Sequence, residues 1–292
     1  MPNSDVASLV EDMDTLARDT WAKVLDGPRL GVPFGEEGIT DHNLFSLRGT
    51  HPELKLQKFT HAKEETNGAD WEWWIGSDES GWVAIRIQAK KLSDGRYYEL
   101  PRKARRQNRS QCQVLIDGVG EDADGQAMFA YYCFYNGWDG EWPAGVPWTV
   151  GCRKPANCPT VPDVKVFGCG LAAAADVAVI LNGTRSTASE DYLPLQWPWS
   201  WLFASDYGRR PYEDALSALE GIISSATAPS GGAQQLAPPP LFQVLPLYAT
   251  AVREDNTDLL ASTEVTSRVP TSTVLVTDLR DSLEGLSTTA VR

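Results

Sequence analysis

Residues 68–92, in which apolar and polar side chains alternate on either side of a turn, constrain this chain more than any other stretch. Two β-prone runs flank residues 76–81, a cluster of turn formers, so the stretch predicts a β-hairpin. Cross-strand partners in an antiparallel pair share a constant index sum. If the turn centres near Glu79, Asp70 therefore lies opposite Gln88.

This alternation divides the hairpin into two unlike faces. The predicted apolar face contains Trp71, Trp73, Ile75, Val83, Ile85, Ile87 and Ala89. The predicted charged face contains Asp70, Glu72, Arg86, Gln88 and Lys90. A solvated sheet face would look the same, so the charges alone do not define a site. Because the register sets Glu72 opposite Arg86, we interpret them as an ion pair, with metal binding by Glu72 as the alternative.

The type and order of the polar groups on this face favour metal chemistry over simple solvation. A carboxylate, Asp70, begins one strand, and Gln88-Ala-Lys90 ends its neighbour. Carboxylate and amide oxygens are suitable ligands for Mg²⁺, which keeps several waters and a substrate phosphate in its shell. A nearby ammonium can stabilise charge developing on phosphorus. Asp70, Gln88 and Lys90 are therefore candidate catalytic residues, the first two as metal ligands.

This arrangement resembles that of the PD-(D/E)XK nuclease superfamily, in the Mrr-like variant in which Gln replaces the acid before x-Lys. The wider pattern is also similar to a bacterial domain family of that superfamily. It comprises Glu37-Gly-Ile-Thr-Asp-x-Asn-Leu44, Gly68-Ala-Asp-Trp-Glu-Trp-Trp74, Gln88-Ala-Lys-Lys-Leu92 and Tyr132-Cys-Phe-Tyr-Asn136. The resemblance covers about the first half of the chain, and more weakly the residues to about 203.

The resemblance implies an α/β, restriction-endonuclease-like fold, with a mixed central sheet between helices. It implies Mg²⁺-dependent cleavage of nucleic acid, most of all DNA, with Mn²⁺ as a substitute, in bacterial restriction or antiviral defence. An acid from an early helix would join the metal site, and Glu37 is the candidate, with Glu36 as the alternative. Gln111, on the helix after the Gln-x-Lys strand, is an accessory candidate beside Glu72. A homodimer and a defence-system partner protein are further expectations.

Charge and composition limit how such an enzyme could meet its substrate. The net charge of −13 argues against non-specific attraction to nucleic acid over the whole surface. Positive charge is concentrated after the Gln-x-Lys strand, at Arg102, Lys103, Arg105, Arg106 and Arg109. These residues are candidates for phosphate contacts, although a solvated helix face is the alternative.

Other classes of protein find little support in the sequence. There is no signal peptide and no apolar run long enough to cross a bilayer, so we expect a cytoplasmic protein with no membrane partner. No Gly-x-Ser-x-Gly elbow, Walker loop or Rossmann fingerprint is present. Five cysteines without C-x₂₋₄-C spacing indicate buried thiols, with a zinc site at Cys133, Cys152, Cys158 and Cys169 as the alternative.

The periodicity predicts one nuclease-like domain with an appended C-terminal part. We expect this domain at residues 1–227, a Pro/Gly-rich linker at 228–240, and an irregular extension at 241–292 that returns to the same domain and ends in a disordered tail. Helices are predicted at 4–26, 36–48, 104–119, 168–181 and 211–225. Further strands are predicted at 54–59, 127–135, 242–248 and 273–279.

Two other functions compete with the nuclease. A non-catalytic nucleic-acid-binding or effector-assembly protein on the same fold is favoured by the neutral Gln88 and the acidic surface. A carbohydrate- or peptide-binding module would instead use the Trp-rich residues 138–148 and 197–201, and it would not require Asp70, Gln88 and Lys90 to converge.

Overall fold

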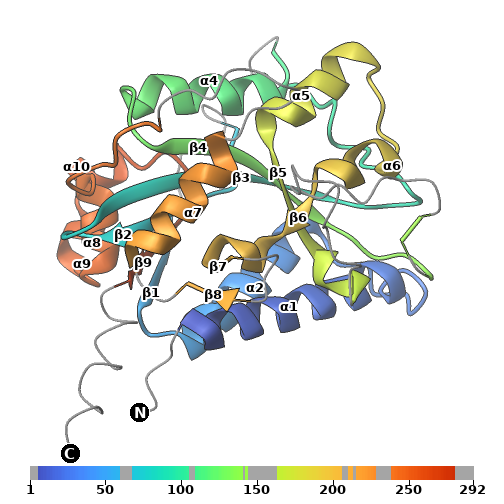
Figure 1. Cartoon of the computed structure of the whole chain (residues 1–292), viewed down its shortest axis with the longest axis horizontal. Coiled ribbons are helices and arrows are strands. Elements are labelled where there is room, and N and C mark those ends of the chain that lie inside the picture. Colours follow the sequence, from blue (N-terminus) through green and yellow to red (C-terminus); the bar gives the residue numbers. More distant parts are fainter. Residues whose placement is uncertain are drawn as a thin grey trace, which may run out of the picture.

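Within the described residues, a seven-stranded mixed sheet in the order β1-β9-β2-β3-β4-β5-β6 runs through the molecule (Figure 1). The computed structural model describes residues 6–59, 68–104, 109–140, 142–143, 163–205, 210–212, 215–227 and 238–279. The strands of this sheet are β1 (Leu54–Lys58), β2 (Trp71–Ser77), β3 (Gly81–Lys91), β4 (Met128–Tyr135), β5 (Cys169–Ala173), β6 (Trp197–Pro198) and β9 (Thr273–Asp278). The fold is therefore mixed α/β, as the sequence predicts.

Strands β2 and β3 form the predicted hairpin in the predicted register. Ser77 pairs with Gly81, which centres the turn on Glu79, and Glu72 pairs with Arg86. Just before β2, the backbone N–H of Asp70 donates to the Ile87 carbonyl at 2.8 Å. The hairpin therefore brings the first residues of β2 beside the last residues of β3.

The C-terminal strand β9 lies inside the sheet rather than at its edge. It runs antiparallel to β1 and parallel to β2. On the other side of the hairpin, β4 runs parallel to β3, and β5 and β6 continue antiparallel. The strands predicted at 54–59, 127–135 and 273–279 are confirmed as β1, β4 and β9.

Helices cover both faces of this sheet. Figure 1 shows α4 on one side and α1 and α2 on the other. The remaining described helices pack around the sheet and its ends. Their bounds are α1 (Val6–Asp26), α2 (Glu36–Thr50), α4 (Gln111–Ala123), α5 (Ala174–Gly183), α6 (Ser189–Tyr192), α7 (Ala215–Thr227), α8 (Leu247–Arg253), α9 (Thr257–Ala261) and α10 (Thr263–Thr266), with 3-10 turns η2 (Val164–Gly168), η3 (Leu193–Leu195) and η4 (Trp199–Phe203) and a small β7–β8 pair (Ala204–Ser205, Arg210–Pro211).

The charged face of the hairpin is not a solvated sheet face, which was the alternative interpretation of the sequence. The predicted apolar face packs in the main core, with α1, α2 and α7. The opposite face carries Trp74, Trp82 and Ala84, which pack with side chains of α8 and α10 in a second buried cluster. The polar groups on that face are consequently buried as well, and they need partners within the protein.

Glu72 and Arg86 form the predicted ion pair, completely buried within the second face. Arg86 Nε donates to Glu72 Oε2 at 2.7 Å, and Trp74 Nε1 and Tyr248 Oη donate to Glu72 Oε1 at 2.7 and 2.6 Å. Arg86 also pairs with Asp122 at 2.7 Å and donates to the Gly118 carbonyl at 3.0 Å. Glu72 is thus a structural residue of the covered face.

Several predicted elements differ from the structure. Residues 168–181 were expected to form one helix, but Cys169–Ala173 is strand β5 and the helix starts at Ala174. An apolar run without clear period suits a buried strand as well as a buried helix. Backbone crowding also requires small residues here, because a Cβ on Gly168 would lie 1.8 Å from the Ala17 carbonyl oxygen.

Two further segments also depart from the expectation. The helix predicted from residue 104 begins at Gln111, where the Ser110 side chain accepts a hydrogen bond from Gln113 N and caps the helix. The strand predicted at 242–248 is a single bridge at Phe242 followed by helix α8. The C-terminal part expected to be irregular therefore contains α8, α9, α10 and β9. The linker residues 228–237 and the tail from residue 280 lie outside the described residues.

His51 joins α1, α2 and β1 through a fully buried ring. Its Nδ1 lies 3.2 Å from Glu53 Oε1, and its Nε2 lies 3.0 Å from Asp12 Oδ2. Burial by itself lowers the pKa of His51, but hydrogen bonds and charge from Glu53 and Asp12 outweigh it, so the pKa is raised above 6.5. This contact therefore favours the protonated ring.

None of the described helices is both long enough and apolar enough to cross a membrane.

Candidate active site

The predicted site residues Asp70 and Gln88 meet at the end of the hairpin away from its turn. Gln88 Nε2 and the backbone N–H of Ala89 each donate to Asp70 Oδ2 at 2.7 Å. On the other side, Ser272 Oγ donates to the Asp70 carbonyl at 2.9 Å and ties this residue to the start of β9. Asp70 is thus held from both neighbouring strands, which fixes its carboxylate at the sheet end.

Lys90, the third predicted residue, lies two positions along the same strand face and is 3% exposed. Its Nζ is 3.9 Å from Glu36 Oε2, and the other Glu36 oxygen accepts the Lys91 backbone N–H at 2.8 Å. Glu36 is the first residue of α2. The helix start therefore brings a carboxylate to the lysine at the end of β3.

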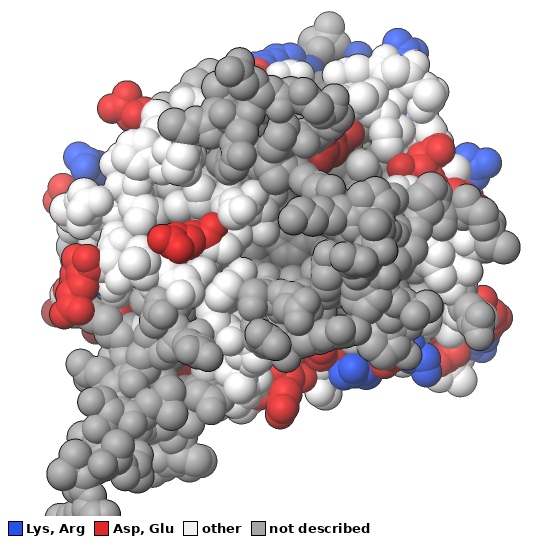
Figure 2. All heavy atoms as spheres, viewed as in Figure 1, with Lys and Arg blue, Asp and Glu red and all other residues white. Residues whose placement is uncertain are grey.

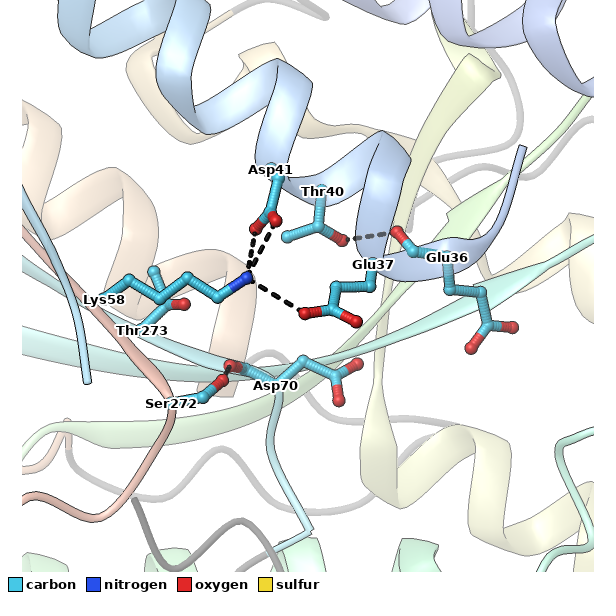
Figure 3. A pocket seen from close by; sticks show the side chains of 8 residues that line it. All are labelled: Glu36, Glu37, Thr40, Asp41, Lys58, Asp70, Ser272 and Thr273. Carbon is cyan, nitrogen blue, oxygen red and sulfur yellow. Dashed lines mark hydrogen bonds and ion pairs between the residues drawn. The ribbon is translucent and has the colours of Figure 1, made fainter. Parts of the chain in front are cut away.

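Glu36 and Glu37 have different surroundings, although they are adjacent in α2. The Glu37 side chain is 81% exposed and accepts a hydrogen bond from Lys58 Nζ at 3.0 Å, whereas the Glu36 side chain is 29% exposed. Figure 3 shows Glu37 turned toward Lys58 and Glu36 extending away from it. The geometry therefore favours Glu36, the alternative, over Glu37 as the helix acid beside Lys90.

A pocket of about 200 Å³ opens between α2 and the ends of β1, β2 and β9 (Figure 3). Its described lining residues are Glu36, Glu37, Thr40, Asp41, Lys58, Asp70, Ser272 and Thr273. Lys58 Nζ bridges Glu37 and Asp41, at 2.8 Å from Asp41 Oδ2. Because carboxylates outnumber ammonium groups in this lining, the pocket attracts cations and repels phosphate.

Sequence reasoning missed the pocket residues Lys58, Asp41, Ser272 and Thr273. Lys58 ends a strand that was predicted, and Asp41 follows Glu37 by one helical turn, so their proximity could have been inferred from α2 packing across β1. Ser272 and Thr273 had no local signal. They reach the pocket because β9 inserts between β1 and β2.

Some buried polar side-chain atoms of the described residues have no hydrogen-bond partner, and one of them belongs to Gln88, which donates to Asp70. In the part of the chain that the structure describes, they are Gln88 Oε1, Gln111 Oε1, Tyr132 Oη and Trp71 Nε1. Gln88 and Tyr132 are register partners on β3 and β4. Burial raises the pKa of the Tyr132 phenol well above its usual value, and Cys112 and Asp70 add in the same direction, so the phenol stays protonated. Such atoms are uncommon in folded proteins and mark places where a ligand or water belongs.

The residues around Asp70 fit a hard divalent cation. Asp70 and Glu36 offer carboxylate oxygens, and the Gln88 amide oxygen is buried and lacks a partner among the described residues. An all-oxygen set suits Mg²⁺ or Mn²⁺. Among the described residues, no group of three or more His, Cys, Asp and Glu side chains is placed to hold a metal. Asp70 and Glu36 are only two such side chains, so a cation bound there would also need the Gln88 amide oxygen and water molecules as ligands.

Comparison with known families classifies the chain. A family model described as a family of unknown function, DUF6615, matches residues 9–282. The chain belongs to the DUF6615 family. No match is found among proteins of curated function. The DUF6615 match therefore covers all the residues that form the site, from Glu36 on α2 to Thr273 on β9.

The basic residues predicted to contact phosphate have acidic neighbours in this DUF6615 chain. Arg102 NH1 lies 2.9 Å from Glu99 Oε2, and Arg109 pairs with Asp117. Lys103 is exposed, and its backbone forms an isolated antiparallel β-bridge with Ser110. Arg105 and Arg106 lie outside the described residues. On the face drawn in Figure 2, the coloured Lys and Arg side chains lie toward the rim with Asp and Glu among them. The described part of this cluster is thus partly neutralised.

The described tryptophans and cysteines among the other predicted features of this DUF6615 chain lie in or against the core. Trp197 and Trp199 are core residues, and Trp138 packs on Trp21 with ring centroids 4.1 Å apart. Trp197 and Trp199 stabilise the core, Trp138, Trp142 and Trp201 are partly buried against it, and Trp148 lies outside the described residues. Cys112, Cys133 and Cys169 are free buried thiols, and Cys152 and Cys158 lie outside the described residues.

Proposed function

We propose that this protein is a metal-dependent nuclease that hydrolyses phosphodiester bonds of nucleic acid, with DNA as the substrate. The observation that carries the proposal is the convergence of Asp70, Gln88, Lys90 and Glu36 at one end of the sheet. The bound cation would neutralise the phosphate and lower the pKa of an attacking water. The resemblance of the same residues to a nuclease superfamily supports this chemistry, and it also supports a cytoplasmic role in bacterial restriction or antiviral defence, as a homodimer or with a defence-system protein.

Each residue has a role that follows from its surroundings. Asp70, Glu36 and the oxygen of Gln88 would hold Mg²⁺ or Mn²⁺. The bonds from Gln88 and Ala89 orient the Asp70 carboxylate. Lys90, buried beside Glu36, keeps a positive charge at the sheet end, where it stabilises charge developing on phosphorus. The acidic lining explains why the cation is needed, because the pocket alone would repel a phosphodiester.

The test is cleavage of supercoiled plasmid and single-stranded DNA with Mg²⁺, Mn²⁺ or EDTA. We expect Asp70→Asn and Lys90→Met to lose roughly 10²-fold or more of the metal-dependent rate. Glu36→Gln and Glu37→Gln form a matched pair, since both remove one carboxylate from adjacent helix positions. The loss for Glu36→Gln should be the larger. Cleavage that survives EDTA, or that is insensitive to Asp70→Asn, would refute the proposal.

A second candidate is a non-catalytic nucleic-acid-binding or effector-assembly protein with the same fold. It is favoured by the hydrogen bond that Gln88 makes to Asp70, which satisfies Asp70 without any cation. Under this alternative, the protein would bind DNA equally well in Mg²⁺ and in EDTA and would cut neither substrate. A gel-shift assay beside the cleavage assay distinguishes the two.

A further inference from the structure

Lys91, the last residue of β3, contacts the start of α2 with both its backbone and its side chain. Its backbone N–H donates to Glu36 Oε1 at 2.8 Å, and its Nζ donates to the Phe34 carbonyl at 2.7 Å. Gly35 lies between these two acceptors as the N-cap residue of α2, and no side chain of its own caps the helix. Lys91 therefore binds the residues on either side of the N-cap.

Lys90 and Lys91 point to opposite faces of β3, because side chains alternate along a strand. Lys91 is on the face of Ala89, which packs in the main core, and Lys90 is on the face of Gln88. Lys90 Nζ lies 3.9 Å from Glu36 Oε2. The Glu36 carboxylate thus has one oxygen toward the Lys91 backbone and the other toward the Lys90 ammonium. Its orientation depends on how the end of β3 holds the start of α2.

Helix electrostatics do not explain an ammonium at this place. The first turn of a helix carries partial positive charge, so acids stabilise this end and cations do not. Glu36 and Glu37 in the first turn of α2 follow that rule, and Lys91 does not. Holding a long, partly buried lysine side chain in one geometry also costs rotamer entropy. The contact with Phe34 therefore has a different effect from helix capping, which is to fix the segment that carries Glu36.

We propose that Lys91 is a positioning residue of the site, whose ammonium holds Phe34 so that Glu36 keeps a carboxylate oxygen in the pocket that it shares with Asp70. This inference rests on the proposed cation site. Charge alone gives the opposite expectation, because removing an ammonium near a cation site makes the site more negative and tightens cation binding. Weaker binding after loss of the Lys91 side chain is therefore the mark of lost positioning.

The experiment is calorimetric titration of the full chain with MgCl₂, for wild type, Lys91→Met and Lys91→Arg. For Lys91→Met we expect a Kd raised about three- to tenfold, because one charged hydrogen bond that holds the start of α2 is lost. Lys91→Arg keeps N–H donors for the Phe34 carbonyl and should restore the wild-type Kd. Lys91→Gln, which is too short to reach Phe34, repeats the measurement with a polar replacement and should match Lys91→Met.

Lys55→Met is the matched control, because it also removes one ammonium and one close contact. Lys55 Nζ pairs with Asp255 Oδ2 at 2.8 Å, and Lys55 is outside the described lining of the pocket. This variant should leave the Kd for Mg²⁺ unchanged. Thermal unfolding of all variants in EDTA gives the stability of the cation-free protein. A lower melting temperature for Lys91→Met with an unchanged Kd would make Lys91 a structural residue only and overturn the inference.

A double-mutant cycle with Glu36→Gln separates failure of this inference from failure of the proposed function. If Lys91 acts through Glu36, Lys91→Met should not weaken Mg²⁺ binding further in the Glu36→Gln protein. Equal weakening in both backgrounds, or tighter binding by Lys91→Met, overturns the inference while the cation site stands. If Glu36→Gln leaves the Kd unchanged, the inference fails together with the proposed role of Glu36. If wild type binds neither Mg²⁺ nor Mn²⁺, the cation site itself fails.

Discussion

Replacing either partner of the buried Glu72–Arg86 pair should destabilise the protein, but by different amounts. Arg86→Met leaves the Glu72 carboxylate with only the neutral donors of Trp74 and Tyr248, inside a cluster that water does not reach. Glu72→Gln leaves Arg86 with Asp122 at 2.7 Å and the Gly118 carbonyl at 3.0 Å. The arginine therefore keeps a charged partner, and the glutamate does not.

The magnitudes follow from that asymmetry. Stranding a buried charge costs about 3–5 kcal/mol, so Arg86→Met should lower the free energy of unfolding by that amount. Loss of one charged hydrogen bond with a remaining partner costs about 1–3 kcal/mol, which is the expectation for Glu72→Gln. At about 2–4 °C per kcal/mol, the melting temperature of Arg86→Met should fall by roughly 6–20 °C.

Chemical and thermal unfolding of both variants and of the double variant test this reasoning. The double variant should be more stable than Arg86→Met alone, because no charge is then left unpaired in the cluster. The reasoning is refuted if Glu72→Gln is the more damaging change, or if the two effects are simply additive.

The remaining predictions concern pH and close packing. The pKa of His51 is raised above 6.5 in the folded state. The stabilisation from protonated His51 should therefore be complete below about pH 6.5 and should disappear as the pH rises through the pKa of the folded state. Melting temperatures measured from pH 5 to 8 should show this loss in wild type and not in His51→Gln. Gly168→Ala should destabilise by about 1–3 kcal/mol or more, because the added Cβ meets backbone of α1 at 1.8 Å. In urea titrations Gly183→Ala is the control, since a Cβ there meets nothing within 4 Å, and an equal loss at both glycines would contradict this account.

The hairpin could be predicted from sequence because its information is local. The turn residues and the period of two set the register, which is why Glu72 is paired with Arg86 and Asp70 lies beside Gln88. The covering of its second face could not be predicted, because the side chains that cover it come from α8 and α10, about 170 residues later. A strand face with charged residues has the same sequence pattern whether solvent covers it or a helix from a distant part of the sequence does.

In the site, too, the sequence alone does not decide which individual side chains meet. Sequence spacing places Glu36 and Glu37 equally near the start of α2, but successive residues on a helix point about 100° apart. Only the packing of α2 against β1 and β3 decides which carboxylate meets Lys90 and which meets Lys58. Ser272 carries no motif, and its place beside Asp70 depends on the position of β9 in the sheet.

The position of β9 also has a consequence for biosynthesis. Ribosomes make β1 to β6 before residues 273–278, yet these residues fill the gap between β1 and β2. Until then the nascent chain carries two open strand edges, and such edges are prone to pair with other chains. The pocket lacks its Ser272 and Thr273 wall for the same interval. Because β9 is made after every other strand of the sheet, the pocket, and with it the proposed cation site, is complete only once residues 272–278 are in place.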